Sequence, residues 1–437
     1  MSQVHAGEAG PPEARPPGRR AMMRLGSIQR LVLIFAILGP GVITGVVDDD
    51  ATGIAGYSLA GAQFGYALLW SLLLVTVALV VVQEISARMG AITGKGLADL
   101  IRERFGVKIT LFAMVTLLVA NATTTVAEFA GIAAAAELFG ISRYLVVPPA
   151  ALVVFGVVVF GTYRKVEIGL LIVSLVFISY LITGFVAQPH WPSVAHGTFV
   201  PTIHLTLPFL TMLIGLIGTT ITPWGQFYLQ SAVVDKGLSE REYKSARIDV
   251  YVGSFITNVI AFFIIVTAAA TLFVHGQPAN TVSDVAESLR PLAGNFAARL
   301  FAIGLLNASL MAAAILPLST AYAICEAFGW ERSVSRPLRE APVFFGLFGG
   351  LLAIGALAVL IPGVPLLVLL FLPNVVGAIL LPVILILTLK IVNDPHIMGR
   401  WVNSRTQNIL AWSTTIVLLV LTAVYATTAI LQFAGVI

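Results

Sequence analysis

The amino-acid sequence predicts an all-α polytopic membrane protein, and three observations support this fold class. The chain has 437 residues, of which 58% are hydrophobic and 11% charged, and its mean hydropathy is +0.97; soluble domains carry about 25% charged residues. Apolar segments of about 20 residues, long enough for a membrane-spanning helix, recur along the chain. Lys and Arg gather in alternate connections between these segments, as they do in cytoplasmic loops. A soluble protein is therefore excluded, and the single cysteine, Cys325, excludes an internal disulfide or a cysteine-rich metal site.

Eleven membrane spans are predicted from the lengths of the apolar segments. Of the 25 Lys and Arg residues, all but Arg143, Arg290 and Arg299 fall on the side of the membrane that holds the N-terminus. This asymmetry predicts a multi-pass protein of the cell membrane, with a cytoplasmic N-terminus and an extracytoplasmic C-terminus. The predicted spans cover residues 31–62, 65–88, 109–136, 145–162, 167–187, 207–234, 250–274, 299–327, 343–361, 365–390 and 408–433.

The spans divide into two units of five, with one span left over. Residues 1–30, rich in Pro and Arg, are predicted to form a disordered basic cytoplasmic tail. Residues 31–187 form the first unit, residues 207–390 the second, and residues 408–433 the eleventh span. Because five is an odd number, the second unit enters the membrane in the opposite orientation. The first span of each unit is long and interrupted by polar residues, which in secondary transporters indicates a substrate site near the middle of the membrane.

The first interruption holds three consecutive carboxylates, Asp48, Asp49 and Asp50. A charge at that depth costs about 3 kcal/mol on insertion scales, so such residues face a bundle interior or a watery path and need a partner. Gly53 and the acids are poor helix formers, so the turn is predicted to unwind and free backbone carbonyls such as that of Val47. A bound cation would satisfy carboxylates and carbonyls together. The alternative is a solvated loop between two helices, each too short to span the membrane.

The second interruption centres on Thr222 and Pro223. Proline lacks an N–H group and clashes with the preceding turn, so the carbonyls from Thr219 onward lose their helical partners. The hydroxyl of Thr219 and the amide of Gln226 add further oxygen atoms. A simple proline kink is the alternative, since such kinks are common in membrane helices. Because this interruption occupies the same position in the second unit as the first interruption does in the first unit, a substrate site is favoured over a simple kink.

Both interruptions offer only oxygen ligands, because neither contains a histidine or a methionine. Carboxylates, carbonyls and water suit hard cations such as Mg²⁺, Ca²⁺ and Mn²⁺, whereas Fe²⁺, Zn²⁺ and copper prefer nitrogen or sulfur. Among other polar residues within the spans, Glu128 is either a proton relay or a hydrogen-bonding partner between helices. Asn374 is either a packing amide or a residue facing the site. Glu84 and Arg88, four residues apart, are predicted to form a structural ion pair.

Five stretches carry a family likeness: Gly39-Pro-Gly-Val-Ile-Thr-Gly, Asp50-Ala-Thr-Gly53 through Ala62-Gln-Phe-Gly-Tyr66, Gln83-Glu-Ile-Ser-Ala-Arg88, Ala127-Glu-Phe-Ala-Gly131 and Thr222-Pro-Trp-Gly-Gln-Phe-Tyr-Leu-Gln-Ser231. In their order and spacing they resemble the Nramp superfamily of divalent metal transporters. The likeness extends over roughly residues 30–435. The resemblance implies a LeuT-type fold of inverted five-helix repeats, alternating access, and a metal site between broken helices one and six.

The chain departs from the members of this family that carry Mn²⁺ and Fe²⁺. Those members have Asp-Pro-Gly-Asn at the first break; here Asp50 stands at the aspartate and Gly53 at the asparagine. They have Met-Pro-His at the second break, where this chain has Thr222 and Trp224 in place of Met and His. An acid on their third span is replaced by Thr125. The pattern resembles the Nramp-related magnesium transporters, which implies a site for Mg²⁺ and Mn²⁺ and transport uncoupled from protons.

The leading hypothesis is therefore a secondary transporter of Mg²⁺ and Mn²⁺, not an enzyme. The cation is its transported substrate rather than a cofactor, the lipid bilayer is its other partner, and neither nucleic acid nor a protein partner is implied. The expected direct ligands are Asp50, Asp49, Asp48 and Thr222; the expected outer or backbone contributors are Val47, Gly53, Thr219, Pro223, Gln226 and Asn374.

Three alternatives remain open from the sequence. The nearest is a proton-coupled Mn²⁺/Fe²⁺ importer of the same fold, in which Glu128 would relay the proton. A sodium-coupled symporter of organic solutes would share the fold, but such carriers bind substrate with aromatic and amide groups rather than three carboxylates. An intramembrane Mg²⁺-dependent enzyme acting on a prenyl diphosphate would need a second acidic motif and nearby basic residues. The chain has neither.

Overall fold

The computed structural model describes residues 40–160, 172–277, 279–331 and 337–433. The predicted basic tail, the start of the first span and the junction between the fourth and fifth spans lie outside these residues. Every regular element in the described part of the chain is helical. The elements are α3 (Pro40–Asp48), α4 (Ala51–Phe64), α5 (Leu69–Thr93), α6 (Leu97–Leu138), α7 (Arg143–Val159), η1 (Ser174–Phe177), α9 (Ile178–Val186), α10 (Trp191–Phe199), α11 (Leu207–Thr220), α12 (Pro223–Asp235), α13 (Tyr243–Ala268), η2 (Ala269–Phe273), α14 (Val282–Ala286), η3 (Glu287–Leu289), α15 (Arg290–Ala293), η4 (Gly294–Phe296), α16 (Ala297–Phe328), α17 (Pro342–Val359), α18 (Leu366–Val392), α19 (Pro395–Met398), η5 (Gly399–Trp401) and α20 (Arg405–Phe433).

These helices follow the predicted spans in order. Within the described residues, eight helical segments are long and apolar enough to cross a membrane, and α7 and η1–α9 are shorter apolar helices. Together with the broken pair α3–α4, these ten segments account for each predicted span. Only eight of the segments are long enough to cross a membrane. A multi-pass membrane protein is confirmed, and the count of eleven stays a prediction.

The connections hold more helix than the sequence suggested. Residues 97–105, which precede the predicted third span, are helical and continuous with it as α6, with a kink at Gly106, whose φ of 75° glycine adopts without strain. The connection after residue 188 contains α10, and residues 282–296 form a chain of short helices from α14 to η4. Proline at the first turn of α10 and of α15 favours helix initiation there.

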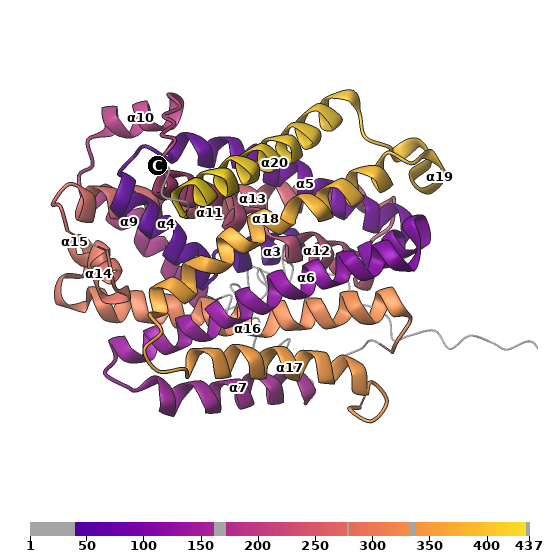
Figure 1. The fold of residues 1–437 in the computed structure, drawn as a ribbon, viewed down its shortest axis with the longest axis horizontal. Coiled ribbons are helices and arrows are strands. Elements are labelled where there is room, and N and C mark those ends of the chain that lie inside the picture. Colours follow the sequence, from indigo (N-terminus) through magenta and orange to yellow (C-terminus); the bar gives the residue numbers. More distant parts are fainter. Residues whose placement is uncertain (1–39, 161–171, 278, 332–336, 434–437) are drawn as a thin grey trace, which may run out of the picture.

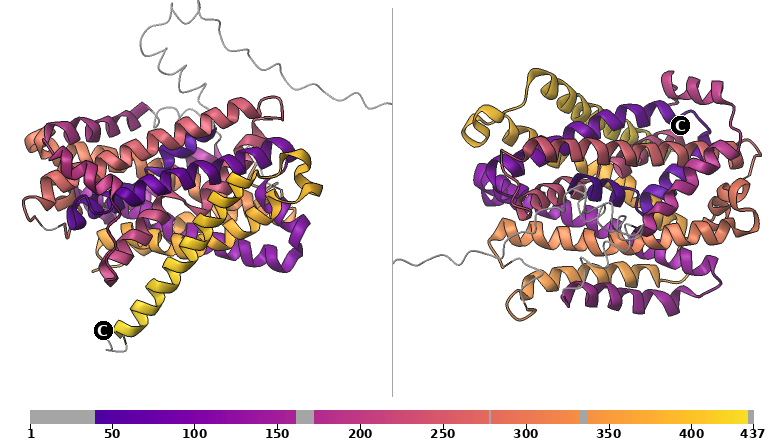
Figure 2. Two further views of the ribbon diagram at one scale, coloured as in Figure 1. Left: turned by 90° about the horizontal axis from the view of Figure 1, so that it is seen from above. Right: turned by 180° about the vertical axis from the view of Figure 1, so that it is seen from behind.

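The helices form a layered bundle around the two interrupted ones. In Figure 1, α7, α17 and α16 run side by side along one edge, and α3 and α12 lie near the centre. The long helix α6 packs against both α16 and α18. On the other side, α20 contacts α18 and α11, and its C-terminal half projects from the bundle (Figure 2). The interrupted helices are therefore enclosed by packed helices, whereas α20 is peripheral.

The short helix α3 is held tightly against α13. A Cβ atom on Gly41 would lie 2.6 Å from the backbone of Val250, and one on Gly45 would lie 2.6 Å from Oγ1 of Thr257. The backbone N–H of Gly41 donates to Asp249 Oδ2 at 2.6 Å, and Thr257 Oγ1 donates to the carbonyl of Gly45 at 2.6 Å. Small residues allow such close backbone approach in membrane helices, where packing and interhelical hydrogen bonds drive association. This contact fixes the end of α3, where the aspartates begin.

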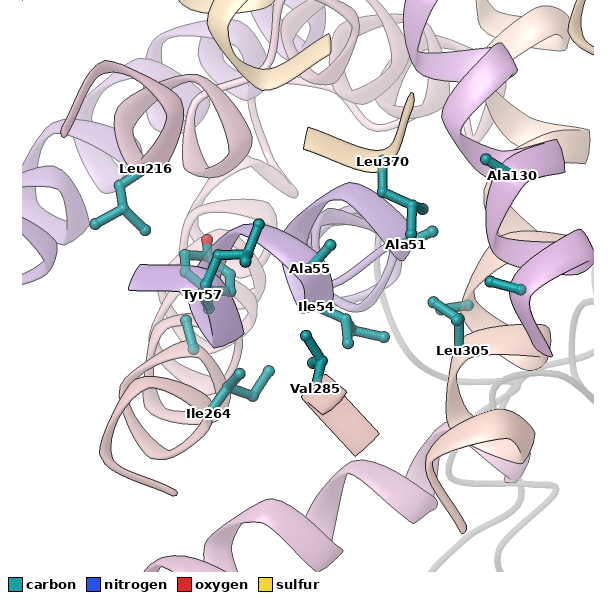
Figure 3. Close-up of a cluster of buried hydrophobic side chains, with 14 of the residues drawn as sticks. Ala51, Ile54, Ala55, Tyr57, Ala130, Leu216, Ile264, Val285, Leu305 and Leu370 are labelled. Atoms are coloured by element: carbon teal, nitrogen blue, oxygen red, sulfur yellow. The ribbon is translucent and has the colours of Figure 1, made fainter. Parts of the chain in front are cut away.

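The other half of the first span, α4, is surrounded by apolar side chains. Figure 3 shows Ile54 of α4 close to Val285 and pointing toward Leu305, while Leu370 lies next to Ala51 and Ala130 lies farther away on α6. All six side chains are at most 5% exposed. They come from α4, α14, α16, α18 and α6, so five helices meet one turn beyond the first break and close it on this side.

Candidate metal site between two broken helices

The first break lies between Asp48, the last residue of α3, and Ala51, the first residue of α4. Asp50 is extended and caps α4: its Oδ1 accepts hydrogen bonds from the Gly53 N–H at 2.9 Å and from Thr52 Oγ1 at 2.6 Å. Aspartate is favoured at this position because its side chain satisfies a backbone N–H that has no helical partner. A Cβ atom on Gly53 would approach the Asp48 carbonyl to 2.9 Å, so the tight turn favours glycine. The predicted interruption is therefore present, but it is shorter than the predicted range of Asp48 to Gly53: Asp48 still belongs to α3, and Gly53 lies in the first turn of α4.

The second break lies between Thr220, the last residue of α11, and Pro223, the first of α12. Ile221 and Thr222 have extended backbone conformations, and Thr222 precedes α12 without capping it through its side chain. Proline is well suited to the first helical position, because its missing N–H would have no partner there. The hydroxyl of Thr222 is thus available to groups across the break, as the sequence predicted.

The two breaks face each other. Thr222 Oγ1 donates to Asp48 Oδ1 at 3.5 Å, joining residues 174 positions apart. A second pair of hydroxyls, Thr52 Oγ1 and Thr219 Oγ1, lies 3.3 Å apart. Next to them, the hydroxyl of Tyr57 is 2.8 Å from that of Thr220. Oxygen atoms from both interrupted helices are therefore gathered in one buried region.

The second oxygen of Asp48 is held by a residue that the sequence analysis did not select. Gln83 of α5 donates from Nε2 to Asp48 Oδ2 at 3.1 Å, and its Oε1 accepts from Ser254 Oγ at 3.2 Å. Gln83 is 1% exposed and directly follows the apolar run 77–82 of α5. A buried amide after this run was the available signal, but its position near a span end and next to Glu84 made an ordinary structural role the simpler interpretation. The predicted ion pair of Glu84 with Arg88 is confirmed at 3.4 Å.

Asp49 differs from its two neighbours. It is fully buried, and neither carboxylate oxygen has a hydrogen-bond partner within the described residues. Oε1 of Gln226 and Nε1 of Trp224, both on α12, are likewise buried and without partners in the part of the chain that the structure describes. An isolated buried carboxylate is strongly unfavourable unless it is neutralised or paired. Asp49 is thus the carboxylate with both oxygens available to an incoming cation.

Two further predicted residues border the first break. Glu128 of α6 accepts a hydrogen bond through Oε2 from the Ala51 N–H at 3.4 Å, and its Oε1 has no partner among the described groups. Because Ala51 directly follows Asp50, this bond places the Glu128 carboxyl group next to the first break. Asn374 of α18 donates to the carbonyl of Thr52 at 3.0 Å. Both residues therefore face the break rather than only packing between helices.

The remaining predicted residues divide between the break and its surroundings. Thr219 and Pro223 lie at the second break, whereas the side chain of Val47 is buried in an apolar cluster with Trp224 and residues of α16. Within the described residues, no three His, Cys, Asp or Glu side chains converge in a ready-made ion site. The three aspartates accordingly point to different partners in this conformation: Asp48 to Gln83 and Thr222, Asp50 to the start of α4, and Asp49 to none.

Comparison with known proteins relates the chain to metal transporters. The family described as natural resistance-associated macrophage protein-like (Nramp) matches residues 41–428. The chain is similar to the divalent metal cation transporter MntH of Bacillus subtilis (strain 168), with 30% identity over 305 residues, or 67% of this chain and 71% of the relative.

Solved structures show the same fold. The manganese transporter of Eremococcus coleocola superposes with a TM-score of 0.73 at 21% identity, covering 96% of this chain and 90% of that one. A nucleobase-cation-symport-1 family transporter in a closed conformation superposes with a TM-score of 0.53 at 16% identity, covering 90% of each chain. The predicted LeuT-type fold is thereby confirmed.

Proposed function

The chain belongs to the Nramp family and is a divalent metal cation transporter, and on that premise we propose that it carries Mg²⁺ and Mn²⁺ without coupling to protons. The transported ion is its substrate; the relatives are transporters, not enzymes, and imply no cofactor. The proposal extends to the orientation, with the N-terminus in the cytoplasm and the C-terminus outside, and to two inverted repeats formed by residues 31–187 and 207–390.

The observation that carries the choice of ion is the donor set at the breaks. Asp48, Asp49 and Asp50 supply carboxylate oxygens, and Thr222 supplies a hydroxyl. Neither break contains a sulfur or an imidazole ligand. Such a set suits hard cations, and Mg²⁺ in particular binds through one or two carboxylates while keeping several of its waters. The relatives named as manganese or divalent metal transporters support a divalent ion as cargo.

In the proposed binding step, the cation enters between Asp49 and the Asp48–Thr222 pair. Asp49 needs no hydrogen bond broken in order to bind it, because both of its oxygens are without partners in the described structure. The 3.5 Å contact between Thr222 and Asp48 is long for a hydroxyl hydrogen bond, so separating the two groups costs little. Asp50 retains one oxygen for the cap of α4 and offers the other.

Apolar side chains on both sides of the breaks support alternating access. Ile54, Leu305 and Leu370 close one side, and Val47, Trp224 and residues of α16 close the other. Opening one seal while the other stays closed would expose the site to one face of the membrane at a time. Movement of the half-helices about their breaks provides such a change.

A proton-coupled Mn²⁺/Fe²⁺ importer is the second candidate, and one contact favours it. Glu128 accepts from the N–H of Ala51, the residue that follows Asp50, so two carboxyl groups lie close to the first break. Neighbouring buried carboxyl groups do not both ionise readily, so one of them would hold a proton when no cation is present. A cation that displaced this proton would couple metal movement to proton movement. The absence of a histidine at either break argues for the uncoupled reading.

Flux measurements distinguish the two candidates. The full-length protein is reconstituted in proteoliposomes, and uptake of Mg²⁺, Mn²⁺ and Fe²⁺ is followed together with the internal pH. We expect uptake of Mg²⁺ and Mn²⁺ with no change in internal pH. Acidification that depends on the metal, or uptake of Fe²⁺ in preference to Mg²⁺, would establish the proton-coupled importer instead. Calorimetric titration of Asp50→Ala tests the site itself: binding equal to that of the wild type would refute its location.

A further inference from the structure

A groove lies between α5, α11 and α20, on the far side of the second break from the aspartates. The three helices contact one another in pairs, and α20 is peripheral, with its C-terminal half leaving the bundle (Figures 1 and 2). The groove has a volume of about 480 Å³, within the range of about 300–1,000 Å³ that is usual for ligand sites. Its floor includes Leu213, Ile217 and Ile221, which recur every four residues along one helix face and are at most 6% exposed.

The walls of this groove are apolar and leave no side-chain donor without a partner. In the described part of the chain, no charged residue lines the groove. Each polar side chain in the wall already donates to a backbone carbonyl: Trp70 to Thr202 at 3.1 Å, Ser71 to Leu68 at 2.7 Å, Thr414 to Leu410 at 2.9 Å, and Ser413 to Ile409. Water or an ion placed here would give up hydrogen bonds without compensation, whereas hydrocarbon has none to give up.

The rim of the groove is continuous with the lipid-facing surface. Leu74 and Val77 of α5 and Val417 of α20 line the groove and are 60%, 46% and 53% exposed. Both helices are long and apolar enough to cross a membrane, so these side chains face lipid. The hydrocarbon region holds no water, and an empty groove would forfeit the dispersion contacts of the atoms that line it. An acyl chain of a neighbouring phospholipid is the occupant that these surroundings supply.

The length of the groove matches one leaflet of a bilayer. Along α20, the lining residues extend from Leu410 to Leu421, which is about 16 Å at 1.5 Å per residue. The hydrocarbon core of a bilayer is about 30 Å thick, so the groove accommodates one acyl chain of one leaflet. Trp70 lines the groove at the start of α5, and tryptophan is enriched at the membrane interface. The head group of the lipid is therefore placed at the Trp70 end.

One residue of the groove floor belongs to the second helix break. Ile221 and Thr222 are the two residues between α11 and α12, and both are extended. Successive side chains of an extended backbone point in opposite directions. Accordingly, Ile221 lines the groove, whereas Thr222 contacts Asp48 at 3.5 Å. The same unwound turn thus has the groove on one side and the ion site on the other.

We propose that the α5–α11–α20 groove binds one acyl chain of a membrane phospholipid, and that this chain supports the unwound turn from the side opposite the ion. Lipid binding does not depend on which ion is carried; only the effect on transport rests on the proposed function. When the half-helices move about the second break, Ile221 moves with them. A flexible acyl chain rearranges around it, whereas a rigid ring fixed in the groove would resist the movement and slow transport.

Photocrosslinking tests lipid binding with the full-length protein in phosphatidylcholine vesicles. A fraction of the phosphatidylcholine carries a diazirine on one acyl chain, and lipid adducts are located by mass spectrometry after irradiation. We expect adducts on residues 213–221, all of which are buried from bulk lipid. Ala78→Phe, which places a ring in the groove, should reduce these adducts at least fivefold and Mg²⁺ flux at least threefold. Thr414→Phe fills the same space from the peripheral helix α20. Ala426→Phe, exposed on α20 outside the groove, is the matched control and should change neither quantity.

The outcomes separate this inference from the proposed function. If the wild type carries no adducts on residues 213–221, or if they persist in both groove-filling variants, the groove is not a lipid site; a dimer in size-exclusion chromatography would then identify a second copy of the chain as its cover. Loss of the adducts with unchanged Mg²⁺ flux would refute the support of the unwound turn. A wild type that carries the adducts but moves no Mg²⁺ would support the lipid site and contradict the proposed function. If Ala78→Phe is misfolded, Thr414→Phe decides the question alone.

Discussion

Asp48 and Thr222, 174 positions apart in the sequence, meet across the two helix breaks with Oδ1 and Oγ1 3.5 Å apart. One residue ends α3 and the other precedes α12, so this contact joins the two interrupted helices at their unwound turns. Because this distance is long for a hydrogen bond from a hydroxyl to a carboxylate, the contact links the two breaks only weakly. The selectivity of the site can be tested at this contact.

Thr222→Met should move the preference of the site from hard to soft cations. The substitution replaces a hydroxyl next to Asp48 with a thioether, which binds soft metals better than Mg²⁺. We expect Mg²⁺ affinity to fall about tenfold, or about 1.4 kcal/mol, while Cd²⁺ and Mn²⁺ binding is kept or strengthened. Calorimetric titration measures both. Thr222→Val, which lacks both oxygen and sulfur, is the control; equal effects of the two variants on Cd²⁺ would show that the thioether does not reach the ion.

Gln83→Leu should weaken cation binding through Asp48. The Gln83 amide donates to Asp48 Oδ2 at 3.1 Å and accepts from Ser254 at 3.2 Å, so its loss leaves two buried polar groups unpaired. Each such group costs about 1–3 kcal/mol. We expect lower thermal stability without metal and at least tenfold weaker Mg²⁺ binding, measured on purified protein. Ser254→Ala, which removes only the outer bond, should have the smaller effect on binding; the reverse order would contradict this role for Gln83.

The sequence was sufficient to locate both breaks, because their determinants are local. Three adjacent acids and a glycine disfavour helix at the first break, and Pro223 forces the second. Gln83 was not selected, because its role depends on how α5 packs against α3, a contact between residues 35 positions apart. The separate partners of Asp48, Asp49 and Asp50 could not be predicted from the sequence either, because the directions of adjacent side chains in an unwound turn depend on tertiary packing. The helix α10 was not predicted because its nine residues are too short for a membrane span.

Gly45→Ala should destabilise the protein by displacing α3 from α13. The added methyl group would lie 2.6 Å from Oγ1 of Thr257, closer than carbon and oxygen can approach, and would disturb the bond from Thr257 to the Gly45 carbonyl. Overpacking of this kind costs about 1–3 kcal/mol. A thermal stability assay in detergent should show a clear decrease in the melting temperature.

Gly346→Ala is the matched control for this packing contact. Gly346 also lies within a helix, α17, but nothing stands within 4 Å of the position its Cβ atom would take. A Gly→Ala change at such a site stabilises by about 0.4–1 kcal/mol. The two variants should therefore shift the melting temperature in opposite directions. A Gly45→Ala protein as stable as the Gly346→Ala protein would mean that α3 is not held against α13 as described.

Arg88→Leu should be more damaging than the loss of the whole ion pair. Arg88 and Glu84 are 3% and 2% exposed, and the Glu84 carboxylate also accepts from Tyr243 and, at 3.1 Å, from Gln407. Removing one partner of a buried pair leaves an uncompensated charge, at a cost of about 3–5 kcal/mol, whereas replacing both with apolar residues is often neutral. The Glu84→Leu/Arg88→Leu double variant should recover part of the stability lost in Arg88→Leu, because the buried charge is gone although Tyr243 and Gln407 still lose their acceptor. Additive losses in thermal stability would argue against coupling between the two residues.

Glu128→Gln tests whether the carboxyl pair at the first break couples transport to protons. The amide keeps an oxygen that can accept the hydrogen bond from the Ala51 N–H, at 3.4 Å in the native protein, but it cannot release a proton to an arriving cation. If transport is uncoupled, Glu128→Gln should transport Mg²⁺ at a rate within about threefold of the wild-type rate, because Asp49 and the Asp48–Thr222 pair are unchanged. The internal pH of the proteoliposomes should stay constant for both proteins. Asp50→Ala, which removes the other member of the carboxyl pair, should abolish flux and so provides the lower reference. Proton entry in the wild type that disappears in Glu128→Gln would instead assign Glu128 as the proton carrier and favour the proton-coupled importer.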